Sequence, residues 1–193
     1  RNTAVGNEAL ALSIATANNT AIGYNALYNN SFGNSNVAVG SRALEDNDYG
    51  GSNTAVGALA LGNNTDGWYN TAIGQAALTG NITGYSNSAI GWRALQSTTT
   101  GFANTAARDR ALEANVDGSH NTSAGFQALF SNTTGEQNTA AGSRALFNNI
   151  SGFGNTAVGV NALNNNTVGY FNVAIGEQAG YMATGNNNIF IAN

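Results

Sequence analysis

The chain has 193 residues and a formal net charge of −4, and only 8% of its residues are charged, against about 25% in a typical soluble domain. It has no cysteine and one histidine, His120, which excludes a disulfide scaffold and metal clusters built from cysteine or histidine. The few arginines form no basic run, and no apolar stretch reaches the roughly 18 residues of a membrane-spanning helix. We therefore expect no metal, no cofactor, no nucleic-acid partner and no membrane insertion in this segment.

An asparagine recurs every 17 residues along the chain. Counted from that asparagine as column 1, the unit reads N-T-A-(V/I)-G-x-x-A-L-x-x-N-x-x-G-x-x. Column 8 is Ala in all eleven units, and columns 5 and 9 are Gly and Leu in ten of them. Such self-similarity indicates a repeat architecture. The units start at Asn2, Asn19, Asn36, Asn53, Asn70, Asn87, Asn104, Asn121, Asn138, Asn155 and Asn172.

A 17-residue unit is too short for a pair of helices, which takes about 33 residues. In each unit the alternation of N-T-A-V-G predicts a short strand, and x-A-L-x predicts a second one. Asn at column 12 and Gly at column 15 tolerate the left-handed backbone of tight turns. The sequence therefore predicts an all-β fold, a β-solenoid of about eleven coils that forms a rod roughly 50 Å long at about 4.8 Å per coil.

The repeat array covers residues 1–187, and residues 188–193 are expected to begin a divergent terminal coil or another module. The eleventh unit is one residue short and has Gly180 where the other units have Leu. It is followed by Asn188-Ile189-Phe190-Ile191, a bulkier form of the first strand.

The constant asparagine is expected to form a column along the rod, in which the stacked amides hydrogen-bond from coil to coil. A column of ligand-binding amides is the alternative to this structural ladder. The ladder residues named from the sequence are Asn19, Asn36, Asn53, Asn70, Asn87, Asn104, Asn121, Asn138 and Asn155.

Each coil offers a thin core of one Leu, one Val or Ile, and two or three Ala. Alternation places Thr and Val/Ile on one face of the strand, and Asn, Ala and Gly on the other. Because so small a core barely offsets the entropy of ordering 17 residues, we expect side-by-side association, most plausibly as a parallel homotrimer. Alternation alone leaves open which face meets the partner chains.

The N-T-A-I-G-x-x-A-L unit resembles the head repeats of the YadA-like trimeric autotransporter adhesins, which carry a similar S-V-A-I-G strand in somewhat shorter coils. It is even more similar to tail-fibre-like arrays with units such as NTAIGYNALYNNSFGNS, often followed by an endosialidase-type chaperone domain. The resemblance covers Asn2 to Asn193. It implies a left-handed parallel β-roll, a homotrimeric fibre on a cell or virion surface, and binding to host surfaces. No catalytic residue of those families matches a position here.

Aromatic residues are the most informative variable positions, because rows of rings could stack against sugar rings or pack against a partner. Five lie at column 16 and one at column 6. The candidate contacts with a glycan or partner are Trp68, Tyr85, Phe102, Trp92, Phe153 and Tyr170.

Other polar groups give weaker signals. The acidic cluster from Glu45 to Asp48 occurs in one unit only, whereas calcium-binding solenoids repeat their ligands in every coil. His120 lies near Asp117 and Ser119 within a single turn, which is not the arrangement of a catalytic triad. We expect no catalytic and no metal-binding residues.

The sequence thus favours a non-catalytic structural and adhesive segment of an extracellular, cell-surface or virion fibre, with itself and a surface glycan or protein as partners. An ice-binding solenoid that uses the Thr of column 2 is one alternative, although Val/Ile at column 4 suits a core better than a second row of ice-binding side chains. A self-assembling extracellular filament subunit is another, because uncapped coil ends can pair.

Overall fold

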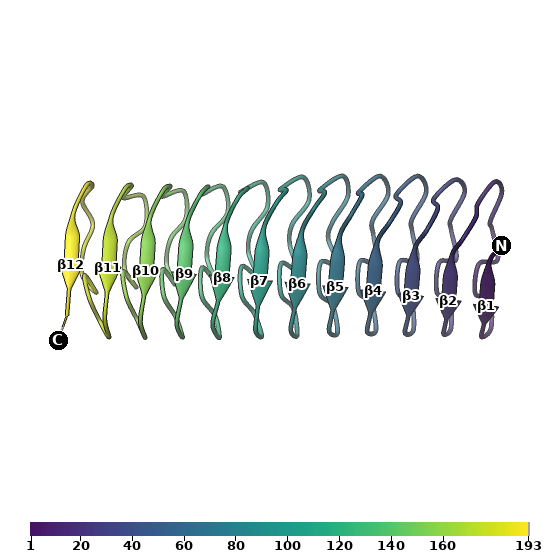
Figure 1. Ribbon diagram of the computed structural model, residues 1–193, viewed down its shortest axis with the longest axis horizontal. Helices are drawn as coiled ribbons and strands as arrows, with labels where there is room; N and C mark the ends of the chain where they lie inside the picture. The colour runs from purple at the N-terminus through teal and green to yellow at the C-terminus, as the bar shows by residue number, and fades with distance from the viewer. Residues whose placement is uncertain (193) are drawn as a thin grey trace.

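The computed structural model describes residues 1–192, which form a parallel β-solenoid of about eleven coils of 17 residues. Twelve short strands lie side by side in chain order in one parallel sheet along the rod (Figure 1). The all-β solenoid prediction is therefore confirmed. The strands are β1 (Thr3–Val5), β2 (Thr20–Ile22), β3 (Val37–Val39), β4 (Thr54–Val56), β5 (Thr71–Ile73), β6 (Ser88–Ile90), β7 (Thr105–Ala107), β8 (Thr122–Ala124), β9 (Thr139–Ala141), β10 (Thr156–Val158), β11 (Val173–Ile175) and β12 (Ile189–Ile191).

The strand register follows the repeat. Ala21 pairs with Ala38, for example, and every pair up to β11 joins residues 17 apart. β12 continues the same sheet with a spacing of 16, since Ala174 pairs with Phe190. The one-residue deletion in the eleventh unit is thus absorbed outside the strand, and residues 188–192 stack on the array.

The prediction of a second strand over x-A-L-x is wrong, because each coil has a single strand. The backbone at columns 7 and 9 is left-handed, and the column-9 leucines have φ between 48° and 54°. The N–H groups of this segment bond alternately to the preceding and the following coil: Asn25 N–H donates to Asn7 O, and Leu27 N–H to Ala43 O. The chain can therefore curve around the core while its backbone stays paired.

The turn residues act through their size rather than through φ. Among residues 1–192, neither the column-12 asparagines nor the column-15 glycines have a positive φ, contrary to the prediction. A Cβ on Gly33 would collide with the side chains of Asn30 and Asn47 and with the carbonyl of Gly50. Column 5 needs glycine for both reasons: Gly40 has φ of 137°, and its Cβ would lie 2.6 Å from the carbonyl oxygen of the next coil.

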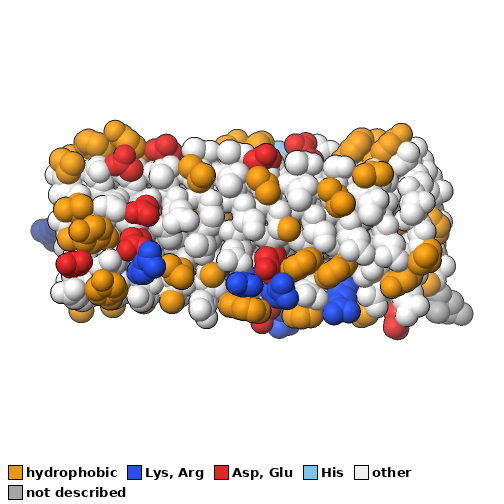
Figure 2. Space-filling view, turned by 180° about the vertical axis from the view of Figure 1, so that it is seen from behind, with side chains coloured by type: hydrophobic (Ala, Val, Ile, Leu, Met, Phe, Trp, Pro, Cys, Tyr) orange, Lys and Arg blue, Asp and Glu red, His pale blue; other side chains and the backbone are white. Residues whose placement is uncertain are grey.

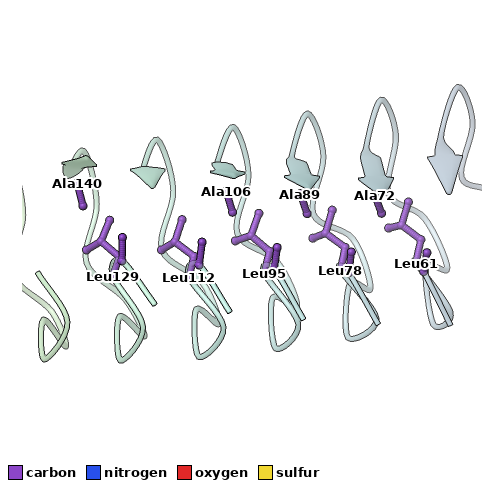
Figure 3. Close-up of a cluster of buried hydrophobic side chains, with 14 of the residues drawn as sticks. Leu61, Ala72, Leu78, Ala89, Leu95, Ala106, Leu112, Leu129 and Ala140 are labelled. Carbon is purple, nitrogen blue, oxygen red and sulfur yellow. The ribbon is translucent and has the colours of Figure 1, made fainter. Parts of the chain in front are cut away.

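Three apolar columns form the core, namely Ala at columns 3 and 8 and Leu at column 9. In Figure 3 the alanines of the strands point toward stacked leucines on the opposite wall, as Ala89 and Leu95 show. Both are fully buried. The expectation that column 4 belongs to the core is wrong, since the strand turns Asn, Ala and Gly inward and leaves Thr and Val/Ile on the outer face.

The column-1 asparagines form a buried ladder. The side-chain oxygen of each one accepts a hydrogen bond from the backbone N–H of the next, at 2.8 to 3.0 Å, as between Asn19 and Asn36. The amide nitrogen donates to a column-15 carbonyl, from Asn36 to Gly50 at 2.9 Å. Asn36 is fully buried, so this column is inaccessible to a ligand in solution.

A second ladder runs along column 12, where Asn47 donates to the side-chain oxygen of Asn30 and to the carbonyl of Gly50. It is interrupted at Thr98, which cannot donate an amide hydrogen to Asn81. The side-chain oxygen of Asn81 is consequently buried without a partner. The same holds for Asn166, because the next coil has Ala183 in this column.

We predict that Thr98→Asn stabilises the protein by about 1 kcal/mol, because a buried unpaired acceptor costs about 1–3 kcal/mol. The thermal midpoint should rise by about 2–4 °C, as measured by circular dichroism. Thr98→Val keeps the shape of Thr98 but adds no amide and should give no gain. Equal midpoints for Thr98→Asn and the parent would contradict the ladder argument.

Arg108 stands in place of the column-5 glycine. It has φ of 115°, where an L-residue is strained, and its side chain is exposed. The column-5 hydrogen bond to the preceding coil is 2.8 Å at Gly74, whereas it lengthens to 3.1 Å at Gly125, the coil after Arg108. The extra Cβ thus locally loosens the stacking, although β7 and β8 still pair in register.

Arg108→Gly is expected to stabilise the chain by about 1 kcal/mol or more, since it relieves a backbone conformation that costs about 1–3 kcal/mol. Arg108→Ala removes the charge but keeps the Cβ, so it should bring no comparable gain. Chemical denaturation of the three proteins checks this, and a gain shared by both variants would show that the arginine charge, rather than the backbone, is responsible.

The eleventh unit and the strand that follows it exchange a large and a small residue. Gly180 replaces the core leucine, and Phe190 of β12 replaces the core alanine. A Cβ on Gly180 would lie 2.6 Å from the Phe190 ring and 3.1 Å from Leu163. The phenyl ring therefore fills the volume that the missing leucine leaves.

This size exchange predicts a strongly non-additive double-mutant cycle. Gly180→Leu should destabilise by about 1–3 kcal/mol through overpacking, and Phe190→Ala, which truncates a half-buried ring, by about 1–3 kcal/mol through lost apolar burial. The double variant restores the Leu–Ala pair of the other coils and should recover at least about 1 kcal/mol relative to the sum. Additive free energies of unfolding would show that the two residues do not share one volume.

Candidate binding surfaces

The outer face of the sheet carries a row of branched side chains at column 4. Val39 is half-buried, and the other Val and Ile residues of this column in β1 to β11 are between 37% exposed at Val56 and 56% exposed at Val5; they stack in register at the strand spacing. Column 2 lies beside them on the same face, with Thr54 half-buried and Thr122 exposed. We call this surface the strand face. Its branched row is interrupted only at Ala107, Ala124 and Ala141 of β7 to β9.

The column-16 aromatics form a row at the start of the strands, where they stack on one another. The rings of Tyr85 and Phe102 lie 4.8 Å apart at 7°, and those of Phe153 and Tyr170 lie 5.0 Å apart at 10°. Because each pair covers its own inner faces, only the ring edges and outer faces remain for a ligand. Trp68 instead tilts against Tyr69 at 6.1 Å.

A shallow depression lies beside Phe153. It is lined by Thr134, Glu136, Gln137 and Ser151 together with the Phe153 ring. These residues come from two successive coils and are all exposed, so the depression is open to solvent rather than an enclosed pocket.

Trp92 is separate from the other predicted aromatics, because column 6 follows the strand whereas column 16 precedes it. It belongs to a set of arginines and rings in coils six to nine, which we call the arginine–aromatic row. Figure 2 shows basic, acidic and apolar side chains gathered in the lower middle of that view. The row consists of Trp92, Arg93, Arg110, Phe130, Arg144 and Phe147.

Each arginine of the row lies over a ring. The guanidinium carbon of Arg93 is 5.0 Å from the centre of Trp92, and that of Arg110 is 4.8 Å from Phe130. Arg144 lies 5.7 Å from Phe147, which stacks on Phe130 at 5.1 Å and 7°. Such cation–π contacts contribute about 0.5–1 kcal/mol at exposed sites, so the row is ordered from coil to coil.

Charge is unevenly distributed along this row. Glu113 accepts a hydrogen bond from Arg110 Nε at 2.5 Å and lies 3.6 Å from Arg93. The hydrogen bond from Glu113 raises the pKa of Arg110, with partial burial opposing it and the charge of Glu113 assisting. Arg144 forms no ion pair among residues 1–192 and donates its Nε to Gln127 at 3.1 Å.

The acidic cluster and His120 take part in local contacts. Glu45 binds Arg42 and Asn25, and Asp46 binds Asn29. The His120 ring packs edge-on against Phe102 at 5.0 Å. Within residues 1–192, no group of three acidic, histidine or cysteine side chains is placed to hold a metal ion.

No helix among residues 1–192 is long and apolar enough to cross a membrane.

The sequence located the aromatic columns but missed the arginine–aromatic row. A signal was available, because Arg recurs at column 7 in Arg42, Arg93, Arg110 and Arg144. This recurrence could be interpreted only with the knowledge that columns 7 and 10 lie side by side on the surface. The incorrect prediction of a second strand placed these columns differently.

Neither a protein-family model, nor a curated protein, nor a solved structure matches this chain.

Proposed function

We propose that the chain is a non-catalytic structural and adhesive segment of an extracellular fibre, on a cell or a virion surface, in which three parallel copies associate. The observation that carries this proposal is the branched row of the strand face, which follows the rod except at β7 to β9. Its partners are other copies of this chain and a surface glycan or protein, without nucleic acid and without membrane insertion.

The strand face supports association because of its length and composition. At about 4.8 Å per coil, the sheet is roughly 50 Å long, and its branched row runs along it on both sides of β7 to β9. Monomeric proteins rarely expose large contiguous apolar surface. The inner face cannot be the interface, since its Ala and Asn columns are filled by the coil itself. The number of three chains and the left-handed coil come from the resemblance to YadA-like and tail-fibre-like repeats.

The first test is the mass in solution, by light scattering after gel filtration. A particle of three times 19.6 kDa is expected. The double variant Ile73→Glu/Ile90→Glu introduces charges at side chains that are exposed in one chain, so it should give a folded particle of one chain. Thr83→Glu adds a charge at an exposed position away from the strand face and should leave the mass unchanged.

If the unmodified protein is a monomer in solution, the proposed trimer is wrong. A particle far heavier than three chains would favour a self-assembling filament. Its mass should then fall when the coil ends are blocked, even though the strand face is unchanged. Circular dichroism of each variant confirms that a change in mass is not a loss of fold.

Ice binding remains a second candidate, because the column-2 threonines are exposed or half-buried on a regular sheet rather than buried. Inhibition of ice recrystallisation by a monomer, lost in Thr54→Tyr/Thr71→Tyr, would support it. A trimer that covers the strand face would exclude it, since ice and the partner chains need the same surface.

A further inference from the structure

We propose that Arg144, with the aromatic rings beside it, binds the acidic group of a polysaccharide that lies along the arginine–aromatic row. The acidic group is a carboxylate or a sulfate on a sugar ring. This site would provide the adhesive part of the function proposed above, but it lies on one chain and does not require association.

The repeat itself shows what an arginine at column 7 binds. In coils three and seven, Arg42 and Arg110 each donate Nε to a glutamate at column 10, Glu45 and Glu113. Column 10 of coil nine is Phe147 instead. Arg144 thus occupies a backbone position at which this fold pairs arginine with a carboxylate, and the carboxylate has been replaced by an aromatic ring.

The guanidinium of Arg144 is held ready for a ligand. Its Nε donates to the side-chain oxygen of Gln127, which is itself only 7% exposed and therefore fixed by its surroundings. No residue between 1 and 192 accepts a hydrogen bond from the two terminal nitrogens of Arg144. A planar guanidinium with both terminal nitrogens open binds a carboxylate or sulfate in the two-pronged manner.

The rings next to Arg144 supply the second half of a sugar site. Phe147 and Phe130 stack in successive coils, and Trp92 at the other end of the row is 42% exposed. Apolar faces of pyranose rings pack on such surfaces, while the charged groups of the ring meet the arginines between them. The site therefore requires both an acidic group and a sugar ring.

Charge favours an acidic polysaccharide over a nucleic acid. The row has three arginines and two carboxylates beside it, Glu113 and Asp109, of which Asp109 accepts a hydrogen bond from the backbone N–H of Trp92, so a local charge of +1 remains. The whole chain, in contrast, carries −4 and has no lysine. A nucleic acid would need phosphate contacts along its backbone, and only Arg144 among the three is free of a carboxylate.

The test is calorimetric titration of the full chain with a hyaluronan decasaccharide, which carries carboxylates, and with dextran sulfate, which carries sulfates. Neutral dextran and a ten-nucleotide thymidine strand are the comparison probes. We expect binding of at least one acidic polysaccharide, weakened by salt, and no binding of neutral dextran. The two acidic probes show which group the site takes.

Two variants and one control locate the site. Arg144→Gln should weaken binding about tenfold or more, as for loss of one charge-assisted contact. Phe147→Glu recreates the internal pair of coils three and seven, so it should keep the fold and also abolish binding. Arg42→Gln removes the same charge outside the row and should bind like the parent.

Trp68→Phe leaves Trp92 as the sole tryptophan, so a change in its fluorescence during titration should report the ligand directly. Equal losses in Arg144→Gln and Arg42→Gln, binding of neutral dextran, tighter binding of the thymidine strand, or failure of both acidic probes would each overturn the proposal. The mass of the particle, measured on the same samples, tests the fibre separately.

Discussion

The fixed distance between coils is the constraint on which the rest of this structure depends. Backbone hydrogen bonds of a parallel sheet set that distance at about 4.8 Å, so every inward side chain meets the same column of the next coil. Only side chains that stack on copies of themselves fit a lumen this narrow. Ala, Leu and Asn meet that requirement, and they occupy the buried columns in most coils, with Thr98 and Ser123 as buried exceptions.

Asparagine suits this requirement because its amide carries both a donor and acceptors. A column of identical amides can therefore satisfy itself, whereas the methyl group of an alanine offers no donor, and the Thr98 hydroxyl makes no hydrogen bond to the neighbouring oxygen. Asn81 and Asn166 lie next to Thr98 and Ala183 and are left unpaired for this reason. The polar columns thus enforce sequence identity between coils more strictly than the apolar columns do, since Gly180 and Phe190 could exchange volume.

The sequence predicted the period, the stacking of the coils and the column-1 ladder, because these follow directly from identical residues at identical spacing. It did not predict the left-handed leucines at column 9, because leucine has no intrinsic preference for that backbone and adopts it only where both neighbouring coils supply hydrogen bonds. The face of column 4 was assigned wrongly for a related reason. Alternation divides a strand into two faces without saying which one points inward. Hydrophobicity favoured the face with Val/Ile, but the lumen is so narrow that only the face with Ala fits inside.

For the candidate surfaces, the sequence identified the rings but not their neighbours. Trp92 was grouped with Tyr85 and Phe102 by residue type, although it lies at the other end of the strand. Contacts such as Arg110 over Phe130 connect different coils and different columns. They depend on the path of the chain between columns 6 and 10, which is set by left-handed residues that the sequence pattern does not reveal.

The outward columns are free of the stacking constraint, so functional differences between coils can accumulate there. The departures from the repeat are concentrated in one segment: β7 to β9 have Ala107, Ala124 and Ala141 in place of the branched row. The same segment carries most of the arginine–aromatic row. These coils contribute least to an apolar association surface and most to a charged, ring-lined one. The proposed association and the proposed ligand binding therefore draw on different parts of the rod, and a substitution that weakens one need not disturb the other.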